Sequence, residues 1–179
     1  MIMYKLVYLI LLFFFFSSFN SNLIGQQTEN FYAIIAAVSE DRIKEDITKL
    51  AGFGTRHTLS DTISKKRGIG AARRWIFSEF QKIAKSCEGC IEVSYQKNFH
   101  QPDGRRIVKP VWINNVIAIQ EGYKYPNRYI IMSGDIDSRI SDPLNYTDDS
   151  PGANDNASGM AGTIEAARIL SKYRFENSI

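Results

Sequence analysis

The chain has 179 residues, of which 44 % are hydrophobic and 23 % are charged, and its formal net charge is +3. This length and composition are typical of one globular domain that is large enough to bury a hydrophobic core. The small positive charge is spread along the chain, which argues against a polybasic protein that binds nucleic acid or a membrane surface. Neither partner is therefore expected, and nothing in the sequence predicts an oligomeric state.

The first residues are typical of an export signal. Lys5 precedes an apolar run over residues 6–16, and polar residues follow from Ser17. This run is shorter than the roughly 20 apolar residues that span a bilayer. We therefore predict a signal peptide over residues 1–26, cleaved between Ser21 and Gln27. The mature protein, from residue 27, is expected to be secreted or periplasmic, without membrane attachment after cleavage.

Two cysteines, Cys87 and Cys90, fit an exported protein. In an oxidising compartment this spacing, with Gly89 between them, favours a small disulfide loop. A thioredoxin-like redox pair normally opens a helix, whereas this pair follows one. Half of a zinc site needs two more ligands, and His57 and His100 lie at unrelated spacings. We predict the disulfide Cys87–Cys90.

Three stretches are predicted to be helices. Ser39 can cap the first, which has apolar residues at Ile43, Ile47 and Leu50. The third runs from about Asn156 to Tyr173. In the second, apolar residues recur at spacings of three and four and define one buried stripe: Ile69, Ala72, Ile76, Phe80 and Ile83.

Strands are predicted between the last two helices. Ile91–Gln96 alternates apolar and polar residues, and Ile107–Ile113 can return as the second arm of a hairpin. Val116–Ile119 and Tyr129–Met132 are continuous apolar runs, typical of central strands, with a turn-like linker over residues 122–127. This order predicts an α/β protein with a sheet between helices. Its last residues resemble the start of another strand, so we expect the domain to be incomplete at its C-terminus.

The segment after the last apolar run is unusually acidic. Ligands of open α/β sheets bind beyond the carboxyl ends of the strands, which is where this segment lies. Asp135 and Asp137 alternate after the strand, and Asp155 stands where the next helix begins. Composition alone is compatible with a metal site or with a solvated acidic loop. The aspartates of the segment are Asp135, Asp137, Asp142, Asp148, Asp149 and Asp155.

Two motifs within this segment resemble a known family. Residues 134–138 read GDIDS and residues 150–159 read SPGANDNASG. They are similar to the paired G-H-x-D-S and G-A-x-D-N-A-S-G signatures of the secreted di-zinc aminopeptidases, metallopeptidase family twenty-eight. Residues 54–57, GTRH, also resemble the region before the catalytic core, so the resemblance covers about residues 30–179. It implies a three-layer mixed sheet flanked by helices, a zinc-exopeptidase-like (phosphorylase/hydrolase-like) fold of which residues 27–179 are the N-terminal portion.

The resemblance also implies roles for three aspartates. Asp155 would be the carboxylate that bridges two zinc ions, Asp135 would stand in the place of the first ligand, and Asp137 would be the catalytic-site carboxylate beside it. The general base and the remaining ligands, among them two adjacent glutamates, would lie downstream, so none is expected in this chain. The implied reaction is removal of the N-terminal residue of a peptide or protein by a metal-activated water. Zinc, as one or two ions, would be held at low occupancy by this chain alone.

One position departs from the family pattern, because Asp135 stands where the family has a histidine. A carboxylate can bind zinc, but it cannot donate a hydrogen bond to its neighbour Asp137 as an imidazole would. An all-carboxylate site, a site with one metal and a degenerate site all remain open. Two other functions also remain open: a non-catalytic peptidase-like binding domain with a degenerate metal site, and a glutaminyl-cyclase-like enzyme that uses one zinc.

Overall fold

The computed structural model describes residues 31–179. The chain divides into two compact units, Met1–Val38 and Ser39–Ile179. In the first unit residues 31–36 form a short helix, and the predicted signal peptide, residues 1–26, lies outside the described residues. No helix between residues 31 and 179 is both long enough and apolar enough to cross a membrane.

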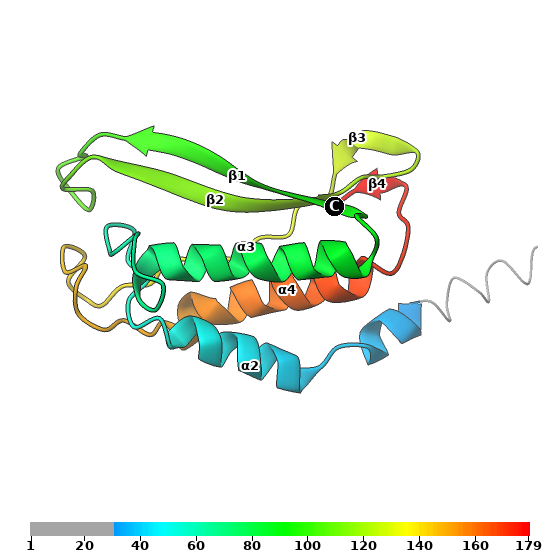
Figure 1. The fold of residues 1–179 in the computed structure, drawn as a ribbon, viewed down its shortest axis with the longest axis horizontal. Helices are drawn as coiled ribbons and strands as arrows, with labels where there is room; N and C mark the ends of the chain where they lie inside the picture. The colour runs from blue at the N-terminus through cyan, green and yellow to red at the C-terminus, as the bar shows by residue number, and fades with distance from the viewer. Residues whose placement is uncertain (1–30) are drawn as a thin grey trace, which may run out of the picture. The chain divides into compact units, whose positions relative to one another are not determined.

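The second unit mixes helices and strands, which confirms an α/β protein (Figure 1). Strands β1 and β2 form one antiparallel pair, β3 and β4 form one parallel pair, and these two small sheets stand in place of the single sheet that was predicted. In Figure 1 the three helices lie on the same side of the β1–β2 hairpin, with α3 next to it. The elements are α2 (Glu40–Ala51), α3 (Gly68–Ser86), β1 (Ile91–His100), β2 (Val111–Gln120), β3 (Tyr125–Tyr129), the π-helical turn η1 (Ala153–Ala157), α4 (Ser158–Leu170) and β4 (Asn177–Ser178).

All three predicted helices are present. The Oγ atom of Ser39 accepts a hydrogen bond from the backbone N–H of Arg42 at 3.3 Å, so Ser39 caps α2 as predicted. The predicted stripe of α3 is its buried face, and it joins residues of α4 and β1 in one core. Helix α4 is shorter than predicted, because Asp155 and Asn156 have non-helical backbone angles and the regular helix begins only at Ser158.

The hairpin differs from the prediction in its second arm. Residues 111–113 of the predicted second arm and the run Val116–Ile119 belong to one continuous strand, β2, whereas residues 107–110 lie outside it. Asn114 and Asn115 stay in the ladder opposite Lys97 and Gln96. The Asn115 side chain donates a hydrogen bond to the Gln96 side chain at 3.0 Å, so this polar pair is satisfied across the strands and does not interrupt them.

The prediction of a central strand over Tyr129–Met132 is wrong in its position. Strand β3 lies in the stretch predicted as a linker, where Tyr125 pairs with Asn177 of β4. Strand pairing decides the outcome, since β4 provides a partner for residues 125–130. No strand among residues 31–179 pairs with Ile131 and Met132, and the Ile131 side chain is 84 % exposed.

A network of ion pairs joins α2, α3 and α4. Glu165 of α4 is 2 % exposed, and its carboxylate accepts hydrogen bonds from the Arg42 guanidinium at 2.6 and 2.9 Å and from the backbone N–H of Ser39 at 2.9 Å. Arg168 pairs with Asp46 at 2.7 Å and with Glu79 at 3.2 Å. Each buried carboxylate of this network therefore has a cationic partner, which offsets its loss of hydration.

The Glu165 interactions make stability depend on pH. Burial opposes ionisation of Glu165, but the hydrogen bonds from Arg42 and Ser39 and the charge of Arg168 outweigh it and lower the pKa. A lowered folded-state pKa contributes stability that is present above the ordinary glutamate pKa of about 4.3 and is lost as pH falls below it. Glu165→Gln should remove this part of the acid dependence and lower the free energy of unfolding by about 2 kcal/mol at neutral pH. This is less than the roughly 3–5 kcal/mol for breaking a fully buried ion pair, because Arg42 is only half-buried. Urea unfolding at pH 7 and pH 3 measures both, and an unchanged pH dependence in the variant would contradict the assignment.

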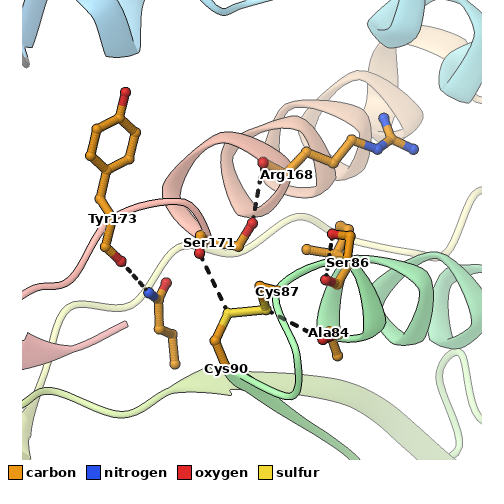
Figure 2. The surroundings of a disulfide bond; sticks show 9 residues. Ala84, Ser86, Cys87, Cys90, Arg168, Ser171 and Tyr173 are labelled. Carbon is orange, nitrogen blue, oxygen red and sulfur yellow. Dashed lines mark hydrogen bonds between the residues drawn. A yellow bond between two sulfur atoms is a disulfide. The ribbon is translucent and has the colours of Figure 1, made fainter.

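A disulfide closes the turn between α3 and β1 (Figure 2). Cys87 and Cys90 are bonded through sulfur atoms 2.07 Å apart. The Sγ atom of Cys90 lies 3.5 Å from the carbonyl oxygen of Ser171, and that of Cys87 lies 3.3 Å from the carbonyl oxygen of Ala84. Oxidised sulfur carries no proton, so these are sulfur–oxygen contacts. Through Ser171 the disulfide places the corner between α3 and β1 against the end of α4.

Candidate metal centre

A buried arginine lies beneath the acidic segment. Arg56 is 0 % exposed, and its guanidinium has only backbone carbonyl oxygens as hydrogen-bond acceptors. Its Nε donates to Ile136, one terminal nitrogen donates to Leu50 and Pro151, and the other donates to Gly152, at distances of 2.9, 2.9, 2.6 and 3.0 Å respectively. One side chain thus ties the end of α2 to both motif segments, residues 134–138 and 150–159.

A chain of hydroxyl groups repeats this connection. The backbone N–H of Arg56 donates to Ser138 Oγ at 3.0 Å, and Ser138 Oγ donates to the carbonyl of Ser150 at 2.6 Å. Ser150 Oγ donates to Thr55 Oγ1 at 3.0 Å, and all three side chains are buried. We call Thr55, Arg56, Ser138 and Ser150 the clamp, because residues on three separate segments hold one another in place.

His57 follows Arg56 in the chain, and both nitrogens of its ring make hydrogen bonds within the fold. Its Nδ1 accepts a hydrogen bond from the backbone N–H of Leu59 at 3.0 Å, and its Nε2 lies 3.0 Å from the carbonyl oxygen of Pro143. A carbonyl can only accept, so Nε2 carries the proton and both ring nitrogens are occupied. His57 therefore positions the acidic segment and has no nitrogen left for a metal.

The two motif segments lie side by side. A Cβ atom added to Gly134 would lie 2.6 Å from the backbone nitrogen of Met160, and one added to Gly152 would lie 2.6 Å from Ser138 Cβ. Both distances are too short for any side chain, so close backbone approach requires glycine at each position. The first contact lies at one end of the paired segments and the second lies at the other end. Asp135 and Asp137 lie between these contacts on one segment, and Asp155 lies between them on the other.

The three predicted aspartates are all exposed. Asp137 acts on the clamp: burial lowers the pKa of Arg56, and the negative charge of Asp137 opposes that effect. Asp155 lies in η1, three residues before α4 begins at Ser158, whereas the helix was predicted to begin at about Asn156. The peptide bond between Asp155 and Asn156 is cis. The Asn156 side chain packs where any side chain at position 159 would collide with it, so Gly159 is also required.

Comparison with known proteins relates the two motif segments to a protein family. The sequence profile of Peptidase family M28 matches residues 115–179, a range that contains both motif segments. The chain belongs to peptidase family M28. The family predicted from the two motifs is therefore confirmed.

Curated relatives extend the similarity toward the N-terminus. A probable zinc metalloprotease of Leptosphaeria maculans is 46 % identical over 151 residues, which cover 84 % of this chain and 35 % of that protein. Another from Pyrenophora teres f. teres is 48 % identical over 147 residues, covering 82 % of this chain and 30 % of the relative. One from Pyricularia oryzae is 46 % identical over 142 residues, covering 79 % of this chain and 28 % of the relative. The chain thus spans about a third of the length of the curated relatives it matches.

These relatives are named probable zinc metalloproteases, so we compared the side-chain donors of this chain with those that zinc requires. Carboxylate oxygens of Asp135 and Asp155 are chemically suited to zinc, which is held in proteins by three or four side-chain ligands. Between residues 31 and 179 no group of three or more histidine, cysteine, aspartate or glutamate side chains could hold a metal ion. The described residues therefore fit part of a zinc site and do not complete one.

Sequence reasoning did not assign a role to the clamp. Arg56 lies in a short segment whose only notable feature was its resemblance to a region before the catalytic core, and Ser138 and Ser150 are ordinary motif neighbours. Their pairings join residues 82 and 12 positions apart, with no periodic pattern in the sequence. A buried arginine in an irregular segment has no single-sequence signal, because burial of a cation depends on carbonyl groups from elsewhere in the chain.

Proposed function

We propose that this chain is the N-terminal part of a zinc-dependent M28 metallopeptidase that removes N-terminal residues from peptides or proteins. Relatives about three times as long are named probable zinc metalloproteases, which supports zinc and peptide hydrolysis. The aminopeptidase specificity rests on the resemblance of the two motifs to the secreted di-zinc aminopeptidases. We also propose that the protein is exported and that residues 1–26 are its signal peptide.

One observation carries the proposal: the clamp holds residues 134–138 and 150–159 side by side, with Asp135 and Asp137 on one and Asp155 on the other. In this arrangement Asp155 and Asp135 are the zinc ligands of this chain. Asp137 lies two residues after Asp135, and its negative charge stabilises the charged form of Arg56. Bound zinc would supply a water activated for attack on a peptide carbonyl. What this chain contributes is two oxygen donors on a rigid base, and further donors come from the remainder of the protein.

The fold proposed for the whole protein is the three-layer zinc-exopeptidase-like one. The helices on one side of the β1–β2 hairpin form one layer of it, and the two small sheets are parts of its central sheet. The protein is proposed to bind one or two zinc ions. The side chain of Asp135 is shorter than the imidazole that it replaces, so Asp135 either binds a zinc ion of its own or leaves a site with one ion at Asp155. The peptidase domain then begins at residue 27.

The test uses a protein of the relatives' length that contains this chain. We expect it to purify with bound zinc and to release p-nitroaniline from leucine p-nitroanilide. A chelator should abolish this activity and added zinc should restore it. The 179-residue chain alone should release no chromophore, because its donor set is incomplete.

An N-terminally acetylated peptide distinguishes exopeptidase from endopeptidase action. Aminopeptidase action requires a free α-amino group, so the acetylated peptide should remain intact. Its cleavage at internal bonds would contradict the aminopeptidase part of the proposal and leave the metallopeptidase part standing. A zinc-free protein of native fold that cleaves nothing would indicate the non-catalytic binding domain. Release of ammonia from N-terminal glutamine without peptide hydrolysis would indicate the glutaminyl-cyclase-like enzyme.

A further inference from the structure

The distal end of the β1–β2 hairpin carries basic and aromatic side chains that the candidate metal centre does not use. We call residues 97–112 the hairpin tip. It holds four cationic side chains and one carboxylate, a net charge of +3, which equals the formal net charge of the whole chain. These charged residues, all of them exposed, are Lys97, Asp103, Arg105, Arg106 and Lys109.

The turn of the tip is ordered by its own carboxylate. Oδ1 of Asp103 accepts hydrogen bonds from the backbone N–H groups of Arg105, Arg106 and Ile107, at 2.8, 3.0 and 2.9 Å. The hydrogen bonds from Arg105 and Ile107 lower the pKa of Asp103. No carboxylate between residues 31 and 179 forms an ion pair with the guanidinium group of Arg105 or Arg106. Both guanidinium groups are therefore available to a ligand.

An aromatic pair lies beside these cations. Phe99 and Trp112 are opposite each other in the strand register, and their ring centroids are 5.2 Å apart. The two side chains are 48 and 57 % exposed. Phe99 lies four residues after Tyr95, whose ring stacks on Phe77 of α3, so the pair lies on the face of the hairpin that is turned toward the helices. Tryptophan and arginine are enriched among the residues that dominate binding energy at interfaces.

The tip lies at the same end of residues 39–179 as the candidate metal centre. In Figure 1 the turn of the hairpin and the loop before α4 are both at the left. Lys109 Nζ lies 4.2 Å from the centre of the Tyr146 ring, and that ring lies 6.1 Å from the ring of His57, the neighbour of Arg56 in the clamp. The path from the tip to the clamp is on the order of 20 Å, a length that about six extended residues span.

The proposed reaction fixes which part of a peptide can reach the tip. Aminopeptidase action places the N-terminal residue at Asp135 and Asp155, so later residues of the peptide lead away from the metal centre. Residues about five or six positions from the N-terminus reach the tip. The guanidinium groups there attract carboxylates and repel lysine and arginine side chains.

We propose that the hairpin tip binds acidic side chains at about the fifth and sixth positions of peptide substrates. Arg105 and Arg106 pair with the carboxylates, and Phe99 and Trp112 provide apolar contacts beside them. This inference rests on the proposed aminopeptidase function and adds a substrate class to it: peptides and proteins with an acidic segment close to the N-terminus. The tip contacts neither the N-terminal residue nor zinc, so it acts on binding and not on bond cleavage.

The test uses the full-length protein and two octapeptides that begin with leucine. Their fifth and sixth residues are both glutamate or both glutamine, and their other residues are alanine. Release of leucine gives KM and kcat. At low salt KM should be about fivefold lower for the glutamate peptide, with equal kcat, because exposed ion pairs contribute modestly. High salt should reduce the difference, and Arg105→Gln/Arg106→Gln should make the two KM values equal.

Lys85→Gln/Lys172→Gln is the matched control. It removes the same charge, and both lysines are exposed, one in the last turn of α3 and the other just after α4. This variant should keep the preference for the glutamate peptide. Equal KM values in the unaltered protein would overturn the proposal, and so would a preference that persists in Arg105→Gln/Arg106→Gln. Loss of the preference in both double variants would also overturn it, because overall charge would then explain the effect.

A binding measurement separates this inference from the proposed function. The two peptides carry a dye at the C-terminus, and fluorescence anisotropy reports their binding to the full-length protein after zinc is removed. If the protein releases no leucine but binds the glutamate peptide more tightly through Arg105 and Arg106, the proposed function fails and the tip is still a site for acidic peptides. If leucine is released without any preference in either assay, the tip proposal alone fails. Arginine-dependent binding of phosphatidylserine vesicles without binding of the peptide would show a membrane partner and overturn the proposal.

Discussion

Arg56→Leu is expected to unfold the candidate metal centre and to lower the free energy of unfolding by about 4 kcal/mol. The guanidinium donates to the carbonyl groups of Leu50, Ile136, Pro151 and Gly152. Leucine would leave those of Ile136 and Pro151 without this donor, whereas the carbonyls of Leu50 and Gly152 keep the backbone N–H groups of Phe53 and Ala157, at 3.3 and 3.0 Å. A buried acceptor without a partner costs about 1–3 kcal/mol, and water entering from the exposed side of the segment recovers part of that sum. Urea unfolding of the 179-residue chain measures the difference.

Two further variants separate hydrogen bonding from charge. Arg56→Lys keeps the cation but cannot reach four acceptors on three segments, so it should lose most of the same stability. Arg139→Leu is the matched control. Arg139 is an exposed residue of the same acidic segment, and its substitution should stay within about 0.5 kcal/mol. If Arg56→Lys retained full stability, charge rather than the hydrogen-bond pattern would account for the clamp.

Asp155→Asn is expected to remove bound zinc from the full-length protein and to lower kcat/KM for leucine p-nitroanilide by more than about 100-fold. Loss of residues that merely support metal ligands already costs 10–100-fold in metal affinity or activity, and Asp155 is proposed as a ligand itself. The substitution preserves size and removes the negative charge. Because Asp155 is exposed, thermal stability of the metal-free protein should change little.

Asp148→Asn provides the control for this experiment. Asp148 is exposed in the same segment and accepts a hydrogen bond from the Asn145 side chain at 2.8 Å, an interaction that an amide oxygen can retain. Zinc content and kcat/KM of this variant should match the unaltered protein. Normal zinc content in Asp155→Asn would remove Asp155 from the ligand set, whereas loss of zinc in both variants would show a diffuse effect of charge on the loop.

Periodic features of the fold could be predicted from the sequence. The stripe Ile76–Phe80–Ile83 and the cap Ser39 are local patterns, and each occurs in the structure as predicted. The prediction over residues 129–132 was wrong because strand formation there depends on a partner strand, which a local apolar pattern does not reveal. The predicted break between two strands at Asn114–Asn115 was wrong for the same reason. Their cross-strand partners decide whether two polar residues end a strand.

In the candidate site, too, the local motifs could be predicted and the long-range contacts could not. The sequence located Asp135, Asp137 and Asp155 through two motifs, and the structure places their segments side by side. It did not reveal that Arg56 supports both segments, because a guanidinium bound only to backbone carbonyls leaves no complementary residue to find. The effect of the Asp137 charge on Arg56 likewise depends on the fold, because the two residues lie far apart in the chain.

The clamp also has a consequence for biosynthesis. Its hydrogen bonds join Arg56 to residues 80–96 positions further along the chain. Contacts of such long sequence separation form late, because the loop between them must first be closed. On the ribosome, α2 and α3 can form while Arg56 still lacks every acceptor except Leu50, and the buried cation has no stable environment until Pro151 and Gly152 have emerged. Pulse-labelled nascent chains that end before residue 150 should therefore expose the segment around Arg56 to proteases.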